Sequence, residues 1–184
     1  MDKDAEAYFR YLNGDDTGLT EMVERYGANL IFFIHRYVKN VDIAEDLMQE
    51  TFCDLIFYKN RYKGKSSFKT YLFSIARNKA VDHIKREMRF SHKPVEDVQK
   101  NLEDEKKLES MVIQKMENKN LYHAMEQLNE DYRNVLYLFY FENLSYEEIG
   151  KVLKKTARQI KNLSYRAKQS LRAIMEKEGF SFEE

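Results

Sequence analysis

Two helix-start signals lie eleven residues apart near the end of the chain, and they constrain its fold more than any other feature. Ser145-x-x-Glu148 and Thr156-x-x-Gln159 both fit the capping box, in which side chains satisfy the free N–H groups of a helix start. The spacing predicts a short helix, a tight break at residues 154–155 and a longer second helix. This is the layout of a helix-turn-helix, whose second helix enters the DNA major groove.

The remainder of the chain also has a helical pattern. Only one proline and six glycines occur in 184 residues, and apolar residues recur with the period of a helix. Since 43% of the residues are apolar, the chain has enough apolar surface to build a core. We expect an all-α fold with helices at 3–13, 18–38, 42–59, 67–89, 108–128, 130–142, 145–153 and 156–177.

The helical pattern weakens between residues 91 and 120. The only proline, Pro94, is followed there by interleaved acidic and basic residues, which bury little surface. Apolar spacing returns at Leu108. We therefore predict two small helical domains, residues 1–92 and 108–184, joined by a flexible linker at 93–107. The second domain contains the helix-turn-helix.

Cysteine usage and the distribution of apolar residues indicate the compartment. The single cysteine, Cys53, excludes an intramolecular disulfide and gives no zinc-binding spacing, which favours a reducing compartment. The first residues form no apolar signal segment, and no apolar run approaches the ~18 residues of a membrane span. We expect a soluble cytoplasmic protein without membrane insertion, in which Cys53 is a partly buried, inert thiol rather than a redox sensor.

The net charge of zero conceals two basic segments. Residues 59–93 contain eleven Lys and Arg against two acids, and residues 151–178 contain nine against two. Residues 121–150 between them contain six acids against one Arg. This pattern predicts two DNA-contacting surfaces rather than a uniformly basic protein, although two solvated helix faces are the alternative.

Polar residues follow one side of the helix expected at 42–59. Asp42, with Glu45 three residues later, is expected to cap this helix. Its apolar residues share the opposite side: Ala44, Leu47, Met48, Phe52 and Leu55. The polar side is called the acidic stripe here and consists of Asp42, Asp46, Gln49, Glu50 and Cys53. It could be a solvated face, a carboxylate site for a metal ion or acid/base catalysis, or a docking surface for a basic partner.

A basic and aromatic segment follows at 57–71. We expect a flexible loop from Gly64 to Ser67, with Ser67 capping the next helix. That helix should bury Phe68, Leu72, Ile75, Ala76 and Ala80. Its other side should carry Tyr71, Ser74, Asn78, Asp82, Lys85 and Arg89. Cations, rings and an amide together are typical of a surface for single-stranded DNA or an extruded base; core aromatics beside a charged loop are the alternative.

Together these segments resemble a bacterial RNA polymerase sigma factor of the extracytoplasmic-function group, in the sigma-70 family. In residues 26–89, AEDLMQETF (44–52) and FKTYLFSIARN (68–78) match the AEDLxQEtF and TWLxxIArN signatures of its second-region domain. In residues 121–175, LSYEEI (144–149) and YRAK (165–168) match LSYEEIA and hRAr of its fourth-region domain. The resemblance covers nearly the whole chain.

The resemblance implies a protein that binds core RNA polymerase, directs it to promoters and promotes strand opening. It implies no enzymatic activity, no cofactor and no metal. The implied partners are the clamp helices of the largest polymerase subunit, the flap of the second-largest subunit, promoter DNA and an anti-sigma factor. The resemblance favours one of the three interpretations of the acidic stripe, namely that it is a docking surface for polymerase.

The resemblance also assigns residues to these partners. Polymerase binding falls to Asp46, Gln49 and Glu50. For the minus-ten element, the resemblance implies that Tyr62 and its loop hold a flipped base and that Asn78 reads the element. Lys85, Arg86 and Arg89 would hold phosphates. The full set is Tyr62, Lys63, Lys65, Ser66, Ser67, Tyr71, Asn78, Lys85, Arg86 and Arg89. The minus-thirty-five element is met in the major groove by Arg158, Lys161, Asn162, Tyr165 and Arg166.

The chain departs from the family pattern in three places. Tyr71 replaces the usual Trp, which reduces the stacking area. Gly150 replaces the usual Ala, which permits close packing at a cost in helix propensity. Lys154-Lys155 replaces the common Gly-apolar turn, so a non-glycine residue is expected in a left-handed conformation.

Two alternatives compete with the sigma-factor hypothesis. A stand-alone repressor or activator could use the same helix-turn-helix, and it would bind duplex DNA tightly without polymerase. A carboxylate-metal nuclease could use Asp42, Glu45, Asp46 and Glu50, and it would bind divalent metal and cleave DNA.

Overall fold

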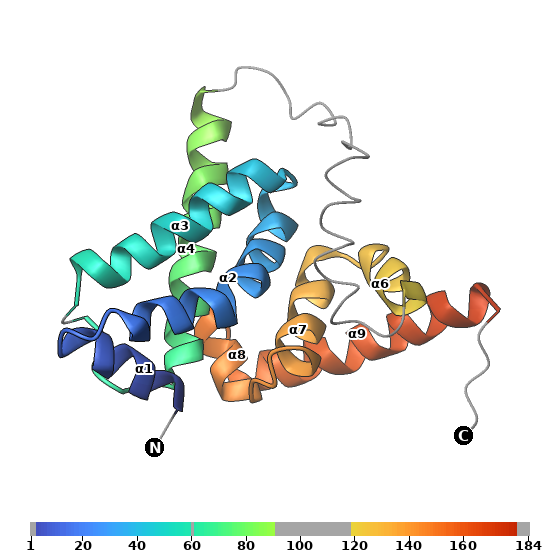
Figure 1. The fold of residues 1–184 in the computed structure, drawn as a ribbon. Coiled ribbons are helices and arrows are strands. Elements are labelled where there is room, and N and C mark those ends of the chain that lie inside the picture. Colours follow the sequence, from blue (N-terminus) through green and yellow to red (C-terminus); the bar gives the residue numbers. More distant parts are fainter. Residues whose placement is uncertain (1–2, 60, 91–118, 180–184) are drawn as a thin grey trace. The chain divides into compact units, whose positions relative to one another are not determined.

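The computed structural model describes residues 3–59, 61–90 and 119–179. All regular secondary structure within these residues is helical, which confirms the predicted fold class. The helices are α1 Lys3–Leu12, α2 Thr17–Val38, α3 Val41–Phe57, α4 Phe68–Phe90, α6 Lys119–Glu126, α7 Glu130–Tyr140, α8 Tyr146–Leu153 and α9 Ala157–Lys177 (Figure 1).

The chain divides into two compact units, Met1–Met111 and Val112–Glu184. The predicted linker at 93–107 and the first part of the helix predicted at 108–128 lie outside the described residues. The exact domain boundaries therefore stay predictions.

Helix α2 is the centre of the first unit, because it packs against α1, α3 and α4. The fully buried rings of Phe33 and Phe73 meet edge to face at 5.2 Å between α2 and α4. Phe73 was not among the predicted core residues, whereas Ile75, which was, is only half-buried. Burial of a large apolar side chain stabilises a fold by about 1.5–3 kcal/mol, so these contacts fix how α4 lies on α2.

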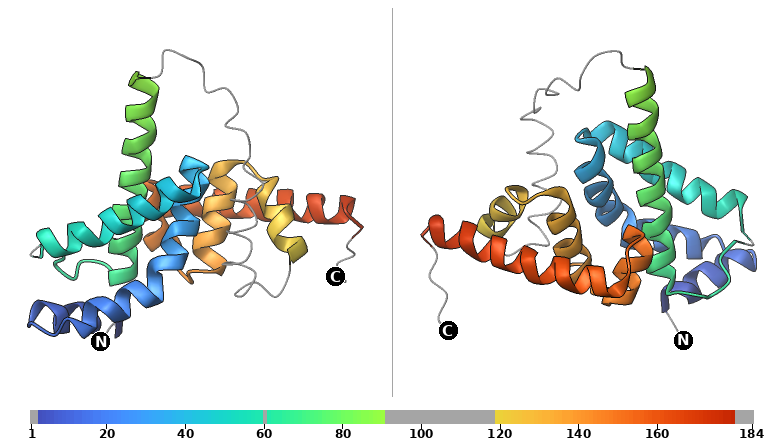
Figure 2. Two further views of the ribbon diagram at one scale, coloured as in Figure 1. Left: turned by 45° about the horizontal axis from the view of Figure 1, so that its top comes forward. Right: turned by 180° about the vertical axis from the view of Figure 1, so that it is seen from behind.

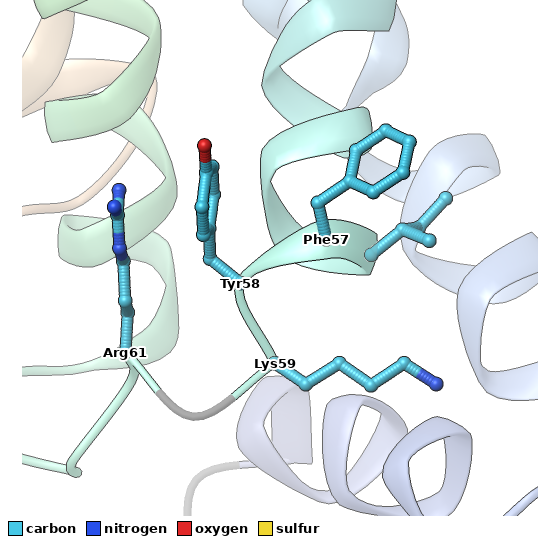
Figure 3. Close-up of a pocket in the computed structure, with 5 residues that line it drawn as sticks. Phe57, Tyr58, Lys59 and Arg61 are labelled. Carbon is cyan, nitrogen blue, oxygen red and sulfur yellow. The ribbon is translucent and has the colours of Figure 1, made fainter.

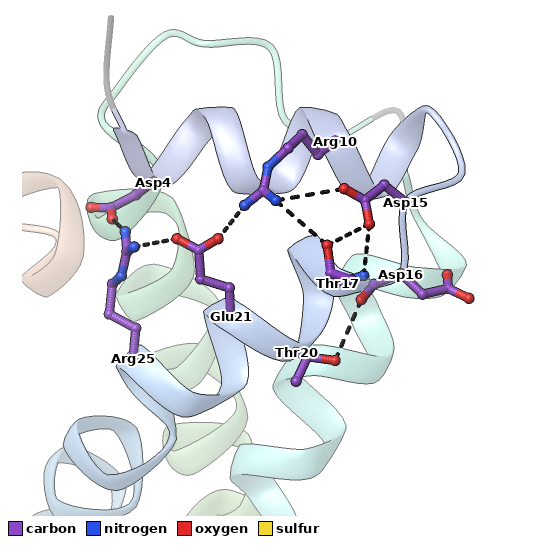
Figure 4. A network of polar contacts seen from close by, with 8 residues as sticks. All are labelled: Asp4, Arg10, Asp15, Asp16, Thr17, Thr20, Glu21 and Arg25. Carbon is purple, nitrogen blue, oxygen red and sulfur yellow. Dashed lines mark hydrogen bonds and ion pairs between the residues drawn. The ribbon is translucent and has the colours of Figure 1, made fainter.

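Polar contacts join α1 to the start of α2 (Figure 4). Arg10 reaches Asp15, at 3.5 Å, and Glu21. Arg25 contacts Glu21 and Asp4. These pairs are partly exposed, so each is worth at most about 1 kcal/mol. They orient α1, while the buried side of that helix supplies most of the attachment.

In the second unit, α9 packs against α6, α7 and α8. Leu136, Ile149 and Ile160, from α7, α8 and α9, are completely buried. Arg133 fastens the turn between α6 and α7, because its guanidinium donates to the backbone carbonyls of Glu126 at 3.0 Å and Leu128 at 2.8 Å. Figure 2 shows α9 as the long helix against which the other helices of this unit pack.

Candidate nucleic-acid interfaces

The acidic stripe faces solvent along α3. All five of its members are exposed, including the three predicted polymerase contacts Asp46, Gln49 and Glu50. On the opposite side Ala44, Leu47, Phe52 and Leu55 are buried, whereas Met48 is half-buried. The predicted division of this helix into an apolar side and an acidic side is therefore present.

The cap of α3 differs from the prediction. The helix begins at Val41, and its N-cap is Asn40, whose side chain accepts a hydrogen bond from the Ile43 N–H at 2.9 Å. The prediction that Asp42 caps the helix was wrong, because Asn40 already satisfies this N–H. Asp42 lies instead in the first turn, where a carboxylate interacts favourably with the positive end of the helix dipole.

Lys79 of α4 reaches the acidic stripe. Its ammonium lies 3.3 Å from a carboxylate oxygen of Glu50 and 3.2 Å from one of Asp54. The lysine is largely buried, with 19% of its side chain exposed, whereas Glu50 is 54% exposed. One end of the stripe is therefore partly neutralised from within the unit, and Asp46 and Gln49 lie beyond this pair.

Cys53, at the edge of the stripe, is exposed. The expectation of a partly buried thiol was therefore wrong. The helical period places residue 53 beside the exposed Gln49 and Glu50, away from the buried side of α3.

The loop before α4 is held by its own hydroxyl groups. Ser67 caps the helix as predicted, because its Oγ accepts from the Thr70 N–H at 3.3 Å and lies 2.7 Å from the Thr70 hydroxyl. The Tyr62 hydroxyl donates to the Ser66 carbonyl at 2.9 Å. Lys63 and Lys65 are exposed between these two anchors.

Tyr62 lies in an aromatic cluster rather than standing alone. Its ring centroid is 5.2 Å from Tyr71, 5.5 Å from Phe68 and 5.9 Å from Tyr8. Tyr8 of α1 is fully buried and stacks on Phe68 at 5.1 Å. Tyr62 is thus half-buried core and half-exposed surface, which combines the two interpretations of this segment.

Tyr8 also ties α1 to the end of α3. Its hydroxyl donates to the Lys59 carbonyl at 2.8 Å, across 51 positions of sequence. Burial raises the pKa of Tyr8 to about 12, so the hydroxyl stays protonated and remains a donor at neutral pH. This contact was missed by sequence reasoning, since α1 shows an amphipathic pattern but no sign of what it packs against.

The exposed side of α4 forms a track that starts at the aromatic cluster. Tyr71 and Asn78 are half-buried along it, and Lys85, Arg86 and Arg89 are exposed on its last turns. At 1.5 Å per residue, Tyr71 and Arg89 are about 27 Å apart. The predicted minus-ten residues thus form an extended strip, and its last turns project beyond α2 and α3 (Figures 1 and 2).

Both helices of the helix-turn-helix begin where predicted. The Ser145–Glu148 and Thr156–Gln159 capping boxes are both complete, with each hydroxyl and each partner side chain in place. The side of α9 that faces the other helices of the unit is buried at Ile160, Ser164 and Ala167. The predicted DNA contacts are all exposed: Arg158, Lys161, Asn162, Tyr165 and Arg166. Tyr165 is 64% exposed.

The turn between α8 and α9 has the strained residue that the sequence predicts. Lys154 takes a left-handed conformation with φ 57°, and the Lys155 N–H bonds back to the Gly150 carbonyl at 3.0 Å. A Cβ on Gly150 would lie 2.6 Å from the Lys155 carbonyl oxygen. Glycine is therefore needed at position 150 because this turn folds directly over it.

Lys168 was counted among the basic residues of the second helix. Its ammonium lies 5.0 Å from the Phe139 ring centre and 5.3 Å from that of Tyr140. This lysine thus also packs α9 onto α7.

Among residues 3–59, 61–90 and 119–179, no three His, Cys, Asp or Glu side chains are grouped to hold a metal ion. In the same part of the chain, no helix is long and apolar enough to cross a membrane.

Family models identify both units. The model of sigma-70 region 2 matches residues 22–90, and that of sigma-70 region 4 matches residues 118–171. The first match covers α3, the loop and α4, and the second covers the helix-turn-helix.

Characterised proteins of similar length match most of the chain. The extracytoplasmic-function sigma factor SigM of Bacillus subtilis is 28% identical over 159 residues, which cover 85% of this chain and 94% of SigM. SigX of the same bacterium is 26% identical, over 84% of this chain and 82% of SigX. The sigma-H factor of Pseudomonas aeruginosa is 27% identical over 181 residues, 93% of each chain.

Solved structures share the fold. The sigma factor RpoE of Bartonella quintana, in complex with the anti-sigma factor NepR, superposes with a TM-score of 0.62 at 19% identity, over 85% of this chain and 96% of RpoE. CnrH, in complex with the cytosolic domain of CnrY, gives a TM-score of 0.61 at 19% identity, over 95% of each chain. The two region models and the full-length relatives agree, and the chain belongs to the sigma-70 family of RNA polymerase sigma factors, in its extracytoplasmic-function group.

Proposed function

We propose that this sigma factor divides promoter recognition between its two units and docks on polymerase through the first. It brings core polymerase to a promoter in the cytoplasm and carries out no bond chemistry itself. The observation that carries the proposal is the arrangement of the first unit, where an exposed acidic helix face lies on α3 and a cationic, aromatic strip lies on α4. One surface suits a basic protein partner, and the other suits a nucleic-acid strand.

Polymerase docking uses Asp46, Gln49 and Glu50. These side chains are exposed on a helix, so the backbone is already ordered and only side-chain rotamers are fixed when they meet a basic surface. Lys79 partly neutralises Glu50, so Asp46 supplies the full negative charge of this docking set. The occupant is the clamp-helix region of the largest polymerase subunit, and the second unit meets the flap of the second-largest subunit.

Strand opening uses the aromatic cluster. Tyr62 presents its exposed side to an extruded base, Lys63 to Ser67 surround that base, and Asn78 reads the minus-ten element. Lys85, Arg86 and Arg89 hold the phosphates further along the same strand. Unstacking a base costs a few kcal/mol, and capture of the extruded base on the protein offsets this cost.

The second unit anchors the upstream element. Arg158, Lys161, Asn162, Tyr165 and Arg166 lie on the exposed side of α9, in the helix that a helix-turn-helix places in the major groove. Two linked, individually weak DNA readers gain affinity through effective concentration, so neither needs to bind free DNA tightly.

An anti-sigma factor is a further partner. One similar solved structure, RpoE with NepR, is a complex with an anti-sigma factor, and its RpoE chain matches 85% of this chain. The anti-sigma factor would compete with core polymerase for binding to this sigma factor.

Run-off transcription tests the proposal. Core polymerase is incubated with a promoter library, with and without the protein, and the transcripts are sequenced. We expect stimulated transcription from promoters that share two elements. If no sequence is stimulated, the proposal fails.

Two additions sharpen this experiment. Asn78→Ala should change the preferred minus-ten sequence and leave the minus-thirty-five preference intact; an unchanged profile would remove Asn78 as a reader. Duplex binding by the protein alone tests the regulator alternative, which requires tight binding without polymerase.

A further inference from the structure

A shallow hollow lies where α3 ends, next to the loop that carries Tyr62. It has a volume of about 610 Å³ and is lined by Ile56, Phe57, Tyr58, Lys59 and Arg61 (Figure 3). Phe57 is 78% exposed and Tyr58 is 45% exposed. Figure 3 shows the two rings on different sides of the end of α3, and the Tyr58 ring lies beside Arg61. None of these residues belongs to the minus-ten set assigned above.

The Tyr58 ring is held as a platform by Arg61. The guanidinium carbon lies 3.6 Å from the ring centre, and Figure 3 shows the two groups side by side and pointing the same way. The Arg61 N–H donates to the Tyr58 carbonyl at 2.9 Å, so the backbone sets this pairing. A cation over one face leaves the other face of the ring for a second flat group.

The platform continues the aromatic cluster. Burial raises the pKa of Tyr71, and the positive charge of Arg61 partly opposes that increase, so the guanidinium acts on the Tyr71 ring as well. Tyr71 is 5.2 Å from Tyr62. The positive charge of Arg61 therefore acts on the aromatic cluster as well as on the Tyr58 ring.

Charge decides the class of ligand. Lys59 and Arg61 both line the hollow, and the Lys59 ammonium also lies 4.8 Å from the ring centre of Tyr11. The nearby Asp54 is paired with Lys79. An apolar protein partner would have to bury two cations, whereas a nucleotide offers a flat base for the ring and a phosphate for the cations.

We propose that Tyr58 and Arg61 form a second base-binding platform, which takes an unstacked base of single-stranded DNA next to the base at Tyr62. This inference rests on the proposed strand-opening role of the first unit. It adds a second captured base and thereby lengthens the stretch of non-template strand that the unit holds open.

Site-resolved fluorescence tests the platform on the holoenzyme. The probe is a 12-nucleotide non-template strand from the strongest promoter of the run-off library, with 2-aminopurine at one position at a time. We expect two quenched positions with the unaltered protein. Tyr58→Leu should remove one quenched position and weaken binding by about 5- to 150-fold, the range of a lost base–aromatic stack. Tyr62→Leu should remove the other.

Control variants separate the outcomes. Tyr58→Phe keeps the ring and should restore quenching. Tyr140→Leu removes a similarly exposed tyrosine near a lysine in the second unit and should change nothing. If Tyr58→Leu keeps both quenched positions while Tyr62→Leu loses one, the platform is refuted and the proposed function stands. If Tyr58→Leu instead weakens polymerase binding, the hollow is a protein contact and the platform is also refuted. If the unaltered holoenzyme quenches no position, both fail.

Discussion

The two proposed DNA surfaces are built in different ways. In the second unit all five predicted contacts lie on α9, whose start is fixed by the Thr156–Gln159 capping box. In the first unit Tyr62 and its loop rest on Tyr8, whose hydroxyl holds a carbonyl 51 positions later in the chain. A surface on one capped helix depends on local sequence, whereas a surface assembled from distant segments depends on tertiary packing. The second kind should be easier to disturb from far away.

The largest effect should come from the acidic stripe, because both DNA surfaces depend on polymerase to reach a promoter. Asp46→Lys with Glu50→Lys should abolish binding to core polymerase, since like charges facing each other cost several kcal/mol. Fluorescence anisotropy of labelled protein with core polymerase measures this. Glu6→Lys with Glu24→Lys makes the same charge change at two exposed positions on α1 and α2, and it should bind normally. Normal affinity of the stripe variant, with its helicity intact, would refute the docking assignment.

On the single-helix surface, Arg158→Ala or Arg166→Ala should weaken use of the minus-thirty-five element. Loss of a base contact costs about 1–3 kcal/mol on one sequence, whereas loss of a phosphate contact weakens all sequences alike. Competition between holoenzymes on single-base promoter variants distinguishes these. Lys177→Ala, at the exposed end of α9, is the charge-matched control. If the arginine variants match it, α9 is not the reading helix.

Gly150→Ala tests how closely the turn of the helix-turn-helix packs on α8. The added methyl group would meet the Lys155 carbonyl at 2.6 Å, and overpacking of this kind costs about 1–3 kcal/mol, of which about 1 is recovered as helix propensity. We expect a net loss of about 1 kcal/mol, measured by hydrogen exchange in α8 and α9. Gly27→Ala in α2 is the matched control, because nothing lies within 4 Å of its added Cβ. It should instead stabilise the first unit; equal effects of the two changes would contradict the clash.

The smallest effect tests the distant support of the first surface. Tyr8→Phe removes the hydrogen bond to Lys59 and should destabilise the first unit by about 1 kcal/mol. Since the folded pKa of Tyr8 is raised to about 12, its contribution is complete below pH 10 and is lost as the pH rises through 12. Unfolding curves from pH 8 to 12 should therefore converge for the variant and the unaltered protein.

Tyr11→Phe is the control for this change, since it removes a hydroxyl from a neighbouring buried ring on the same helix. It should keep the alkaline loss of stability. If Tyr8→Phe keeps the alkaline loss of stability as Tyr11→Phe does, the Tyr8 hydroxyl does not support the loop.

Sequence alone predicted the helical class and most helix positions to within two residues. It succeeded where local chemistry decides, as in both capping boxes, the Ser67 cap and the left-handed residue before α9. It failed at the start of α3, because Asn40 and Asp42 are both good caps and only the backbone conformation distinguishes them.

The candidate sites show the same division. The exposed contacts on α9 follow from helical period, since one side of that helix is plainly apolar. Lys79 beside Glu50 and Tyr8 beneath Tyr62 join segments 29 and more residues apart. No local sequence pattern predicts such contacts, because they depend on how α1, α3 and α4 pack around α2.

The stacking of Tyr8 on Phe68, the first residue of α4, also orders events during synthesis. Phe68, which stacks on Tyr8, leaves the ribosome sixty residues after it, or roughly 3–12 s later at bacterial elongation rates. Until then α1 can pack against α2, but Tyr8 lacks the ring that stacks on it. The first unit therefore completes its packing only after the loop that carries Tyr62 has emerged, and a product stalled before that point lacks the ring contacts of Tyr8 with Tyr62 and Phe68.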